Sequence, residues 1–264
     1  MDEAILEKVQ ARHEYVQAHV TPNIVVMTVL VGSQNYGLEN ENSDIDTYSF
    51  ILPPFGTFIQ DRRLETSELD FTDGSKATIK DFRSFMKLLR RPTPNSVECL
   101  LSEYKVYDKN FAAVLTRFLD DEYMLYSLTH ADFNHMINST AGTMASLHGR
   151  NMSEGKKVSH VIRLYYLLQH YCKSFWSTSE YLTPYGHQLT YAKAAKNQEL
   201  SPELLNQLHN LYLEKINDFK QNYTISSMQA LQESISEYSL QKFEQEIILV
   251  YLAVQGVKIH AYGT

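Results

Sequence analysis

The chain has 264 residues, of which 44% are hydrophobic and 21% are charged, and its formal net charge is -7. This balance is typical of a globular protein and excludes the collagen-like, coiled-coil and disordered classes. The longest apolar runs, 24–31 and 247–254, are far shorter than the ~20 residues that a membrane-spanning helix needs. With two cysteines and an acidic start that lacks a signal-peptide pattern, we expect a cytoplasmic protein that does not associate with membranes.

The negative net charge limits the ways in which the protein could bind a polyanion. A field of that sign does not attract RNA or nucleotides from a distance. Any such ligand must therefore be bound through a local basic site or through a metal ion.

The first half of the chain alternates between helical and strand patterns. In chain order, the patterns predict a helix at 4–19, buried strands at 24–31 and 45–52, a hairpin of strands 68–71 and 75–79, and a helix at 81–91. Asp73-Gly74 is a favoured turn pair for the hairpin.

The second half has almost no strand pattern. It predicts helices over 123–148, 155–176, 202–221 and 226–254. We therefore predict an α+β protein, with a mixed-sheet domain at residues 1–121 and an all-helical domain at residues 122–264.

The segment that indicates chemistry follows the first buried strand. Gly32 and Ser33 come directly after that strand, where a glycine lets backbone N–H groups approach a ligand and a following helix N-terminus favours phosphate. Asp44 and Asp46 are two residues apart on a strand, so both side chains project from one face. Two such carboxylates repel each other unless a cation lies between them, and Mg²⁺ prefers a few carboxylates together with phosphate oxygens. Each feature alone is common in plain turns and strand ends, but their order and spacing favour a nucleotide site.

These residues resemble a known family. Gly32-Ser33, Tyr36-Gly37-Leu38 and Ser43-Asp44-x-Asp46 are similar to the signature of DNA polymerase β superfamily nucleotidyltransferases, in particular to the branch of bacteria and phages named for RNA repair. The resemblance extends to three further segments: Lys80–Arg83, Pro94–Leu101, and Gly155–Lys157 with His160 and Arg163.

The resemblance implies a two-metal nucleotidyl transfer from an NTP to a hydroxyl, with an RNA end, a protein side chain or a small molecule as acceptor. Asp44 and Asp46 would hold two Mg²⁺ ions, or Mn²⁺, and Gly32 and Ser33 would bind the β- and γ-phosphates. Lys156, His160 and Arg163 have i, i+4, i+7 spacing on one helix face and would contact the phosphates, although a solvated helix face has the same pattern.

The family's third carboxylate has no clear counterpart here. Thr78 stands where close relatives have an aspartate, and Lys76 lies on the same strand face. Asp70, Asp73 and Asp81 are the candidates, and we predict Asp73 as the third catalytic carboxylate, although a turn role explains it equally well.

Two other interpretations of the fold stay open. The first is a degenerate member that binds a nucleotide or a partner protein with little catalysis, which Lys76 and Thr78 favour. The second is an antitoxin-like protein that transfers AMP to a toxin's tyrosine, which the long helical half disfavours.

Overall fold

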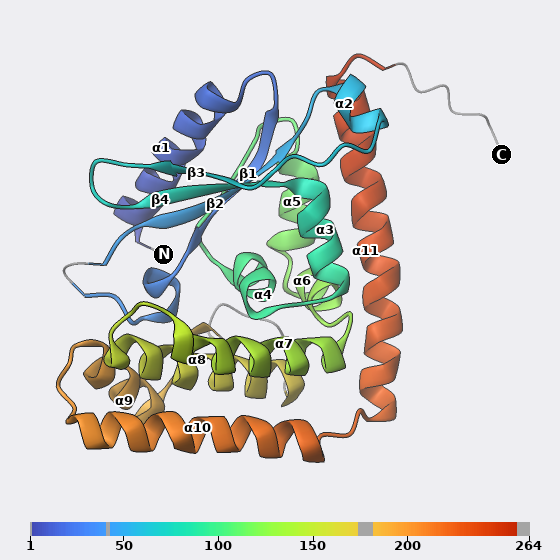
Figure 1. The fold of residues 1–264 in the computed structure, drawn as a ribbon. Helices are drawn as coiled ribbons and strands as arrows, with labels where there is room; N and C mark the ends of the chain where they lie inside the picture. The colour runs from blue at the N-terminus through green and yellow to red at the C-terminus, as the bar shows by residue number, and fades with distance from the viewer. Residues whose placement is uncertain (1, 41–42, 174–181, 258–264) are drawn as a thin grey trace.

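The apolar, β-branched run that was predicted as a buried strand forms β1 (Ile24–Val31) near the centre of a five-stranded sheet (Figure 1). The computed structural model describes residues 2–40, 43–173 and 182–257. Within these residues the other strands are β2 (Asp46–Leu52), β3 (Ser67–Asp70), β4 (Lys76–Asp81) and β5 (Lys105–Tyr107). The strand order is β3-β4-β2-β1-β5; β2 and β4 are parallel, and the other neighbours are antiparallel. The predicted α+β class with a mixed sheet is confirmed.

The two faces of the sheet have different coverings. Helix α1 (Glu3–Val20) packs on one face, where Val9 and Val16 are fully buried against strand residues. On the other face, register places Val31 beside Asp46 and Thr78 beside Tyr48. This second face therefore carries polar side chains at its centre, and it faces the helical half of the molecule (Figure 1).

Helices make up the rest of the described chain. They are α2 (Phe55–Ile59), α3 (Phe82–Arg90), α4 (Pro94–Leu101), α5 (Ala112–Leu119), α6 (Glu122–Thr129), α7 (Phe133–Ser146), α8 (Glu154–Lys173), α9 (Gly186–Lys196), α10 (Pro202–Asn222) and α11 (Ser227–Val254), with 3-10 turns η1 (Ser33–Tyr36) and η2 (Leu147–Gly149).

The single helix predicted at 123–148 is two helices, because Asp132 caps a new helix by accepting from the His135 amide. The end of the helix predicted at 155–176 lies beyond Lys173, outside the described residues.

One hydrophobic core joins the two halves of the chain. Its buried members include Phe82 and Phe85 of α3 together with Phe118 and Phe243, and α11 runs beside α3, α5 and α6 (Figure 1). The division at residue 121 therefore stays a prediction. Among the described residues, no helix is both long and apolar enough to span a membrane.

Candidate active site

A tight loop that follows β1 forms one wall of the candidate site. Gly32 has a φ of 93°, in the region that favours glycine, and the next four residues form a 3-10 turn instead of the helix expected there. The Gly32 amide donates to Glu98 Oε1 at 2.6 Å, so it is directed toward α4. The Ser33 side chain lies at the N-terminus of the turn and lines an adjoining cavity. The loop thus presents Ser33 to a ligand, while its glycine amide binds the protein itself.

Asp46 begins β2, and Asp44 lies two residues before it, outside the strand on which both were expected. Asp46 Oδ1 accepts from the Lys76 amide at 2.9 Å, and a Cβ built on Gly74 would lie 3.7 Å from Asp44 Oδ1. Burial raises the pKa of Asp46, and the charges of Asp44 and Asp73 raise it further, against the lowering effect of Lys76. This pair of hard oxygen donors fits a divalent cation. No group of three or more His, Cys, Asp or Glu side chains among the described residues is arranged to hold a metal ion alone.

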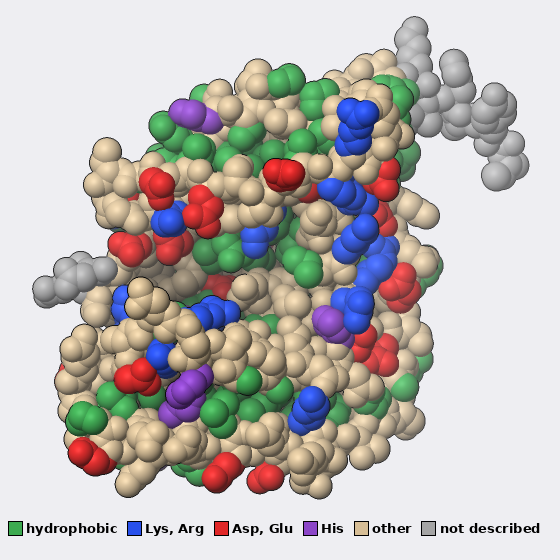
Figure 2. Space-filling view, viewed as in Figure 1, with side chains coloured by type: hydrophobic (Ala, Val, Ile, Leu, Met, Phe, Trp, Pro, Cys, Tyr) green, Lys and Arg blue, Asp and Glu red, His purple; other side chains and the backbone are tan. Residues whose placement is uncertain are grey.

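These residues line a cavity of about 370 Å³ between the sheet and the helices. Its walls are formed by Gly32, Ser33, Tyr36, Leu38, Asn40, Ser43, Asp44, Asp46, Lys156, Ser159, His160, Lys196 and Gln198. We call it the first cavity. Figure 2 shows the surface hollowed between the two halves, with acidic side chains gathered on the sheet side and basic ones on the helical side.

A second cavity of about 450 Å³ adjoins the first. The two share four lining residues, namely Gly32, Tyr36, Asp46 and His160. The second cavity extends over the polar face of β2 and β4, past Thr78, toward α4, α7 and α8. Asp46 therefore lies where the two cavities meet.

Helix α8 contributes to both cavities. Lys156 and His160 line the first cavity, whereas Arg163 lines only the second. Burial and nearby cations, first among them Arg163, lower the pKa of His160 to about 3. The three side chains share a helix face as predicted, but His160 is neutral at pH 7, so two of the three are cations.

A lysine that the sequence pattern did not reveal completes the first cavity. Lys196, at the end of α9, donates through Nζ to the Leu38 carbonyl at 2.6 Å and to Ser43 Oγ at 3.1 Å. Burial and the neighbouring Lys156 lower its pKa. Because it contacts a segment more than 150 residues earlier, no local motif could have indicated it.

The candidate third carboxylates lie in different places. Asp81 caps α3, accepts from Arg83 and Leu64, and is buried at the far end of β4. Asp73 is half exposed in the hairpin turn, where Arg12 Nη2 donates to it at 2.6 Å. The turn that contains Asp73 lies beside Asp44, since a Cβ built on Gly74 would be 3.7 Å from Asp44 Oδ1. Asp73 itself lines neither the first nor the second cavity, and its role as the third carboxylate stays a prediction.

Lys76 engages the acidic residues of β3. Its Nζ lies 3.1 Å from Glu68 Oε2 and 3.5 Å from Asp70 Oδ1. Glu68 lines the second cavity together with Thr78, to which strand register pairs it. Glu68 was not predicted as a site residue. The signal was present, because Glu68 and Asp70 are two residues apart on a predicted strand and therefore lie on one face, the face that carries Lys76.

A buried carboxylate on α4 organises the loop. Glu98 is 3% exposed and accepts from the Gly32 amide, from Asn35 Nδ2 at 3.4 Å and from the Tyr36 hydroxyl. Burial raises its pKa, while Arg163 opposes that rise. Glu98 therefore fixes the beginning of the loop from the opposite wall.

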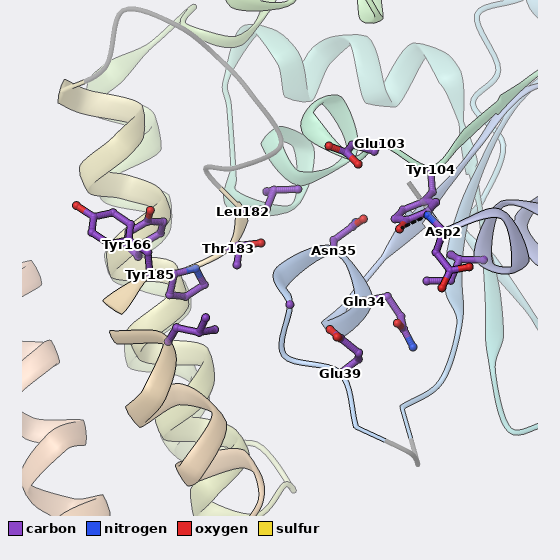
Figure 3. Close-up of a pocket in the computed structure, with 14 residues that line it drawn as sticks. Asp2, Gln34, Asn35, Glu39, Glu103, Tyr104, Tyr166, Leu182, Thr183 and Tyr185 are labelled. Atoms are coloured by element: carbon purple, nitrogen blue, oxygen red, sulfur yellow. Dashed lines mark hydrogen bonds between the residues drawn. The ribbon is translucent and has the colours of Figure 1, made fainter. Parts of the chain in front are cut away.

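A third, larger cavity lies on the other side of the same loop. It measures about 890 Å³, and Gln34, Asn35 and Glu39 face it across from Tyr166 and the segment 182–185 (Figure 3). The loop thus separates this cavity from the first one.

The comparison with protein families agrees with this geometry. A mixed sheet with Gly-Ser after one strand and Asp-x-Asp at the start of the next defines a polymerase-β-like nucleotidyltransferase fold. The family model for the RNA repair pathway DNA polymerase beta family (RlaP) matches residues 1–246, and the chain belongs to that family. None of the curated proteins matches the chain.

Proposed function

We propose that this protein is a divalent-metal-dependent nucleotidyltransferase that transfers NMP from an NTP to a hydroxyl acceptor, with RNA as the first acceptor to test. The observation that supports this is the lining of the first cavity: Ser33, the pair Asp44 and Asp46, and two lysines face one space. Acidic residues and cations on opposite walls of one cavity suit a triphosphate that binds together with metal ions.

Each wall has a distinct part in this proposal. Asp44 and Asp46 would hold Mg²⁺, two ions in the family's pattern, with Mn²⁺ as a substitute. Such ions would supply charge neutralisation and would lower the pKa of the acceptor hydroxyl. Gly32 shapes the loop, and Ser33, Lys156 and Lys196 contact phosphate oxygens. Neutral His160 donates or accepts a hydrogen bond without adding charge. Asp73, as the predicted third carboxylate, would accept the proton of the acceptor hydroxyl.

The test is metal-dependent release of pyrophosphate. Purified protein is given each NTP in turn with Mg²⁺ and RNA, and the double variant Asp44→Asn/Asp46→Asn is compared with the wild type. Asp218→Asn, at an exposed position of α10, serves as the matched control. We expect release that the double variant abolishes and the control retains. Release that survives in the double variant would refute the proposed site.

The second candidate function is nucleotide binding without turnover. It is favoured by Lys76, whose backbone amide binds Asp46 and whose ammonium holds Glu68 and Asp70. This candidate predicts NTP binding with no pyrophosphate release from the wild type under any condition of the first assay. A label transferred from the NTP to RNA or to a protein side chain would exclude it and identify the acceptor.

A further inference from the structure

The second cavity is lined by an arginine that has two guanidinium nitrogens without hydrogen bonds. Arg163 is 5% exposed, and its Nε and Nη1 have no hydrogen-bond partner within the part of the chain that the structure describes. Burying N–H groups without acceptors is costly, because they have lost hydrogen bonds to water and have not replaced them. Such a group is suited to a ligand that brings acceptor oxygens.

The guanidinium is held in position before any ligand arrives. It stacks on the Tyr36 ring, with its central carbon 3.8 Å from the ring centroid, and Nη1 lies 4.0 Å from Glu98 Oε2. That separation is at the limit of an ion pair, and Glu98 already accepts from Gly32 and Asn35. Glu98 and Tyr36 therefore orient Arg163 but leave N–H groups of its guanidinium without a hydrogen-bond acceptor.

The charged side chains around the second cavity balance in number, and its two arginines come from the helical side. Arg150 also lines the cavity. Lys76 and Glu68, on the opposite wall, neutralise each other at 3.1 Å. The remaining carboxylates are Asp46, at the junction with the first cavity, and Glu98, beneath the arginine. His160 is neutral at pH 7. Two arginines thus face one space that already adjoins the proposed site of transfer.

From this arrangement we infer that the second cavity is an acceptor subsite in which Arg163, supported by Arg150, binds a phosphate group of the acceptor molecule. The inference rests on the proposed function, because the second cavity can bind the acceptor only if the NTP binds in the first. The acceptor class that fits is a phosphate-bearing polyhydroxyl compound, such as the terminal nucleotide of a polynucleotide. Transfer would form a bond between the acceptor oxygen and the NTP α-phosphorus and break the bond from that phosphorus to the pyrophosphate oxygen. The acceptor's proton would leave to a carboxylate.

The test uses AMP and adenosine as probes, which differ only in the phosphate. The full-length protein is first saturated with α,β-methylene-ATP and Mg²⁺, and each probe is then titrated by calorimetry. We expect the wild type to bind AMP about tenfold more tightly than adenosine, because a charge-assisted hydrogen bond to a phosphate is of that order. Arg163→Gln should remove this preference and leave the affinity for the ATP analogue within about twofold of the wild type.

Lys156→Gln is the matched control, because Lys156 lies on the same helix and lines only the first cavity. It should weaken the ATP analogue and retain the preference for AMP. If Arg163→Gln instead weakens the analogue and leaves that preference intact, Arg163 belongs to the NTP site and the inference is wrong. If Arg163→Gln does not fold, Arg163→Gln/Glu98→Gln removes both charges of the buried pair. It should likewise lack the preference for AMP, but because Glu98 holds the loop of the first cavity, its affinity for the ATP analogue is not used as a control.

If the first cavity is not an NTP site, the result is different. In that case the ATP analogue does not bind to the wild type, and Asp44→Asn/Asp46→Asn changes nothing. AMP and adenosine are then titrated without the analogue. A preference for AMP that Arg163→Gln abolishes would still support a phosphate site at Arg163, and an unchanged preference would overturn it.

Discussion

Helices α8 and α9 are in close backbone contact at a glycine, and replacing it gives a sharp test of the structure. A Cβ built on Gly155, the second residue of α8, would collide with the backbone carbonyl of Ala195 on α9. The obstacle is main chain and not the end of a flexible side chain, and Ala195 is fully buried. Gly155→Ala therefore requires α9 to move away from α8.

The magnitude follows from two opposing effects. Overpacking a close contact costs about 1–3 kcal/mol, and rigid backbone on both sides puts this site near the upper value. Replacing glycine by alanine in a helix stabilises the folded state by at most about 1 kcal/mol, through helix propensity. The net loss is about 2 kcal/mol, which corresponds to a melting temperature lower by about 4–8 °C for a chain of this size.

Gly142→Ala is the matched control and should have the opposite sign. Gly142 lies inside α7, and a Cβ there would have nothing within 4 Å. The free energy of unfolding should rise by about 1 kcal/mol, since only helix propensity changes. Both variants are measured by calorimetry and denaturant titration. A Gly155→Ala protein as stable as the wild type would refute the close approach of α8 and α9.

Three further predictions concern other parts of the molecule. Burial lowers the pKa of His130 to about 4, so between pH 6.5 and 4 the unfolded chain binds more protons than the folded protein and stability falls as the pH falls. The loss in the free energy of unfolding is about 2 kcal/mol at pH 5. Denaturant titrations should show that His130→Gln lacks this pH-dependent loss. Lys196→Gln should weaken NTP binding about tenfold in calorimetric titrations. Lys193→Gln, at an exposed position of α9, should leave the NTP affinity unchanged. Thr93→Ala removes the capping box of α4 and should lower the free energy of unfolding by about 1 kcal/mol, measured against Thr190→Ala as a helix-surface control.

Features that depend on local sequence were predicted well. The strand at 24–31 has the predicted bounds, and the hairpin forms around Asp73-Gly74, because apolar runs and turn pairs act over a few residues. β5 was not predicted because a strand of three residues is too short to show an alternating hydrophobic pattern. α9 was missed because its surface is polar and only Ala192 and Ala195 are buried.

The candidate site was predicted in part for a similar reason. Ser33, Asp44 and Asp46 stand in a short motif, and the structure brings them to one cavity. Glu98 and Lys196 act across 66 and more than 150 residues, so only the folded chain shows their contacts. The expected helix after Gly32 is a 3-10 turn, since Gly37, with a φ of 60°, ends it after four residues.

These two distant residues explain why the loop that forms the site depends on the helices. Glu98 on α4 holds the Gly32 end of the loop, and Lys196 on α9 holds the Leu38 and Ser43 end. Asp44 directly follows the second attachment. A shift of α9 would therefore change the position of Lys196 and, through Ser43, that of the neighbouring carboxylate. Gly155→Ala should for this reason weaken NTP binding as well as stability, whereas Gly142→Ala should change stability alone. Equal NTP affinity in the two variants would show that the loop does not depend on α9.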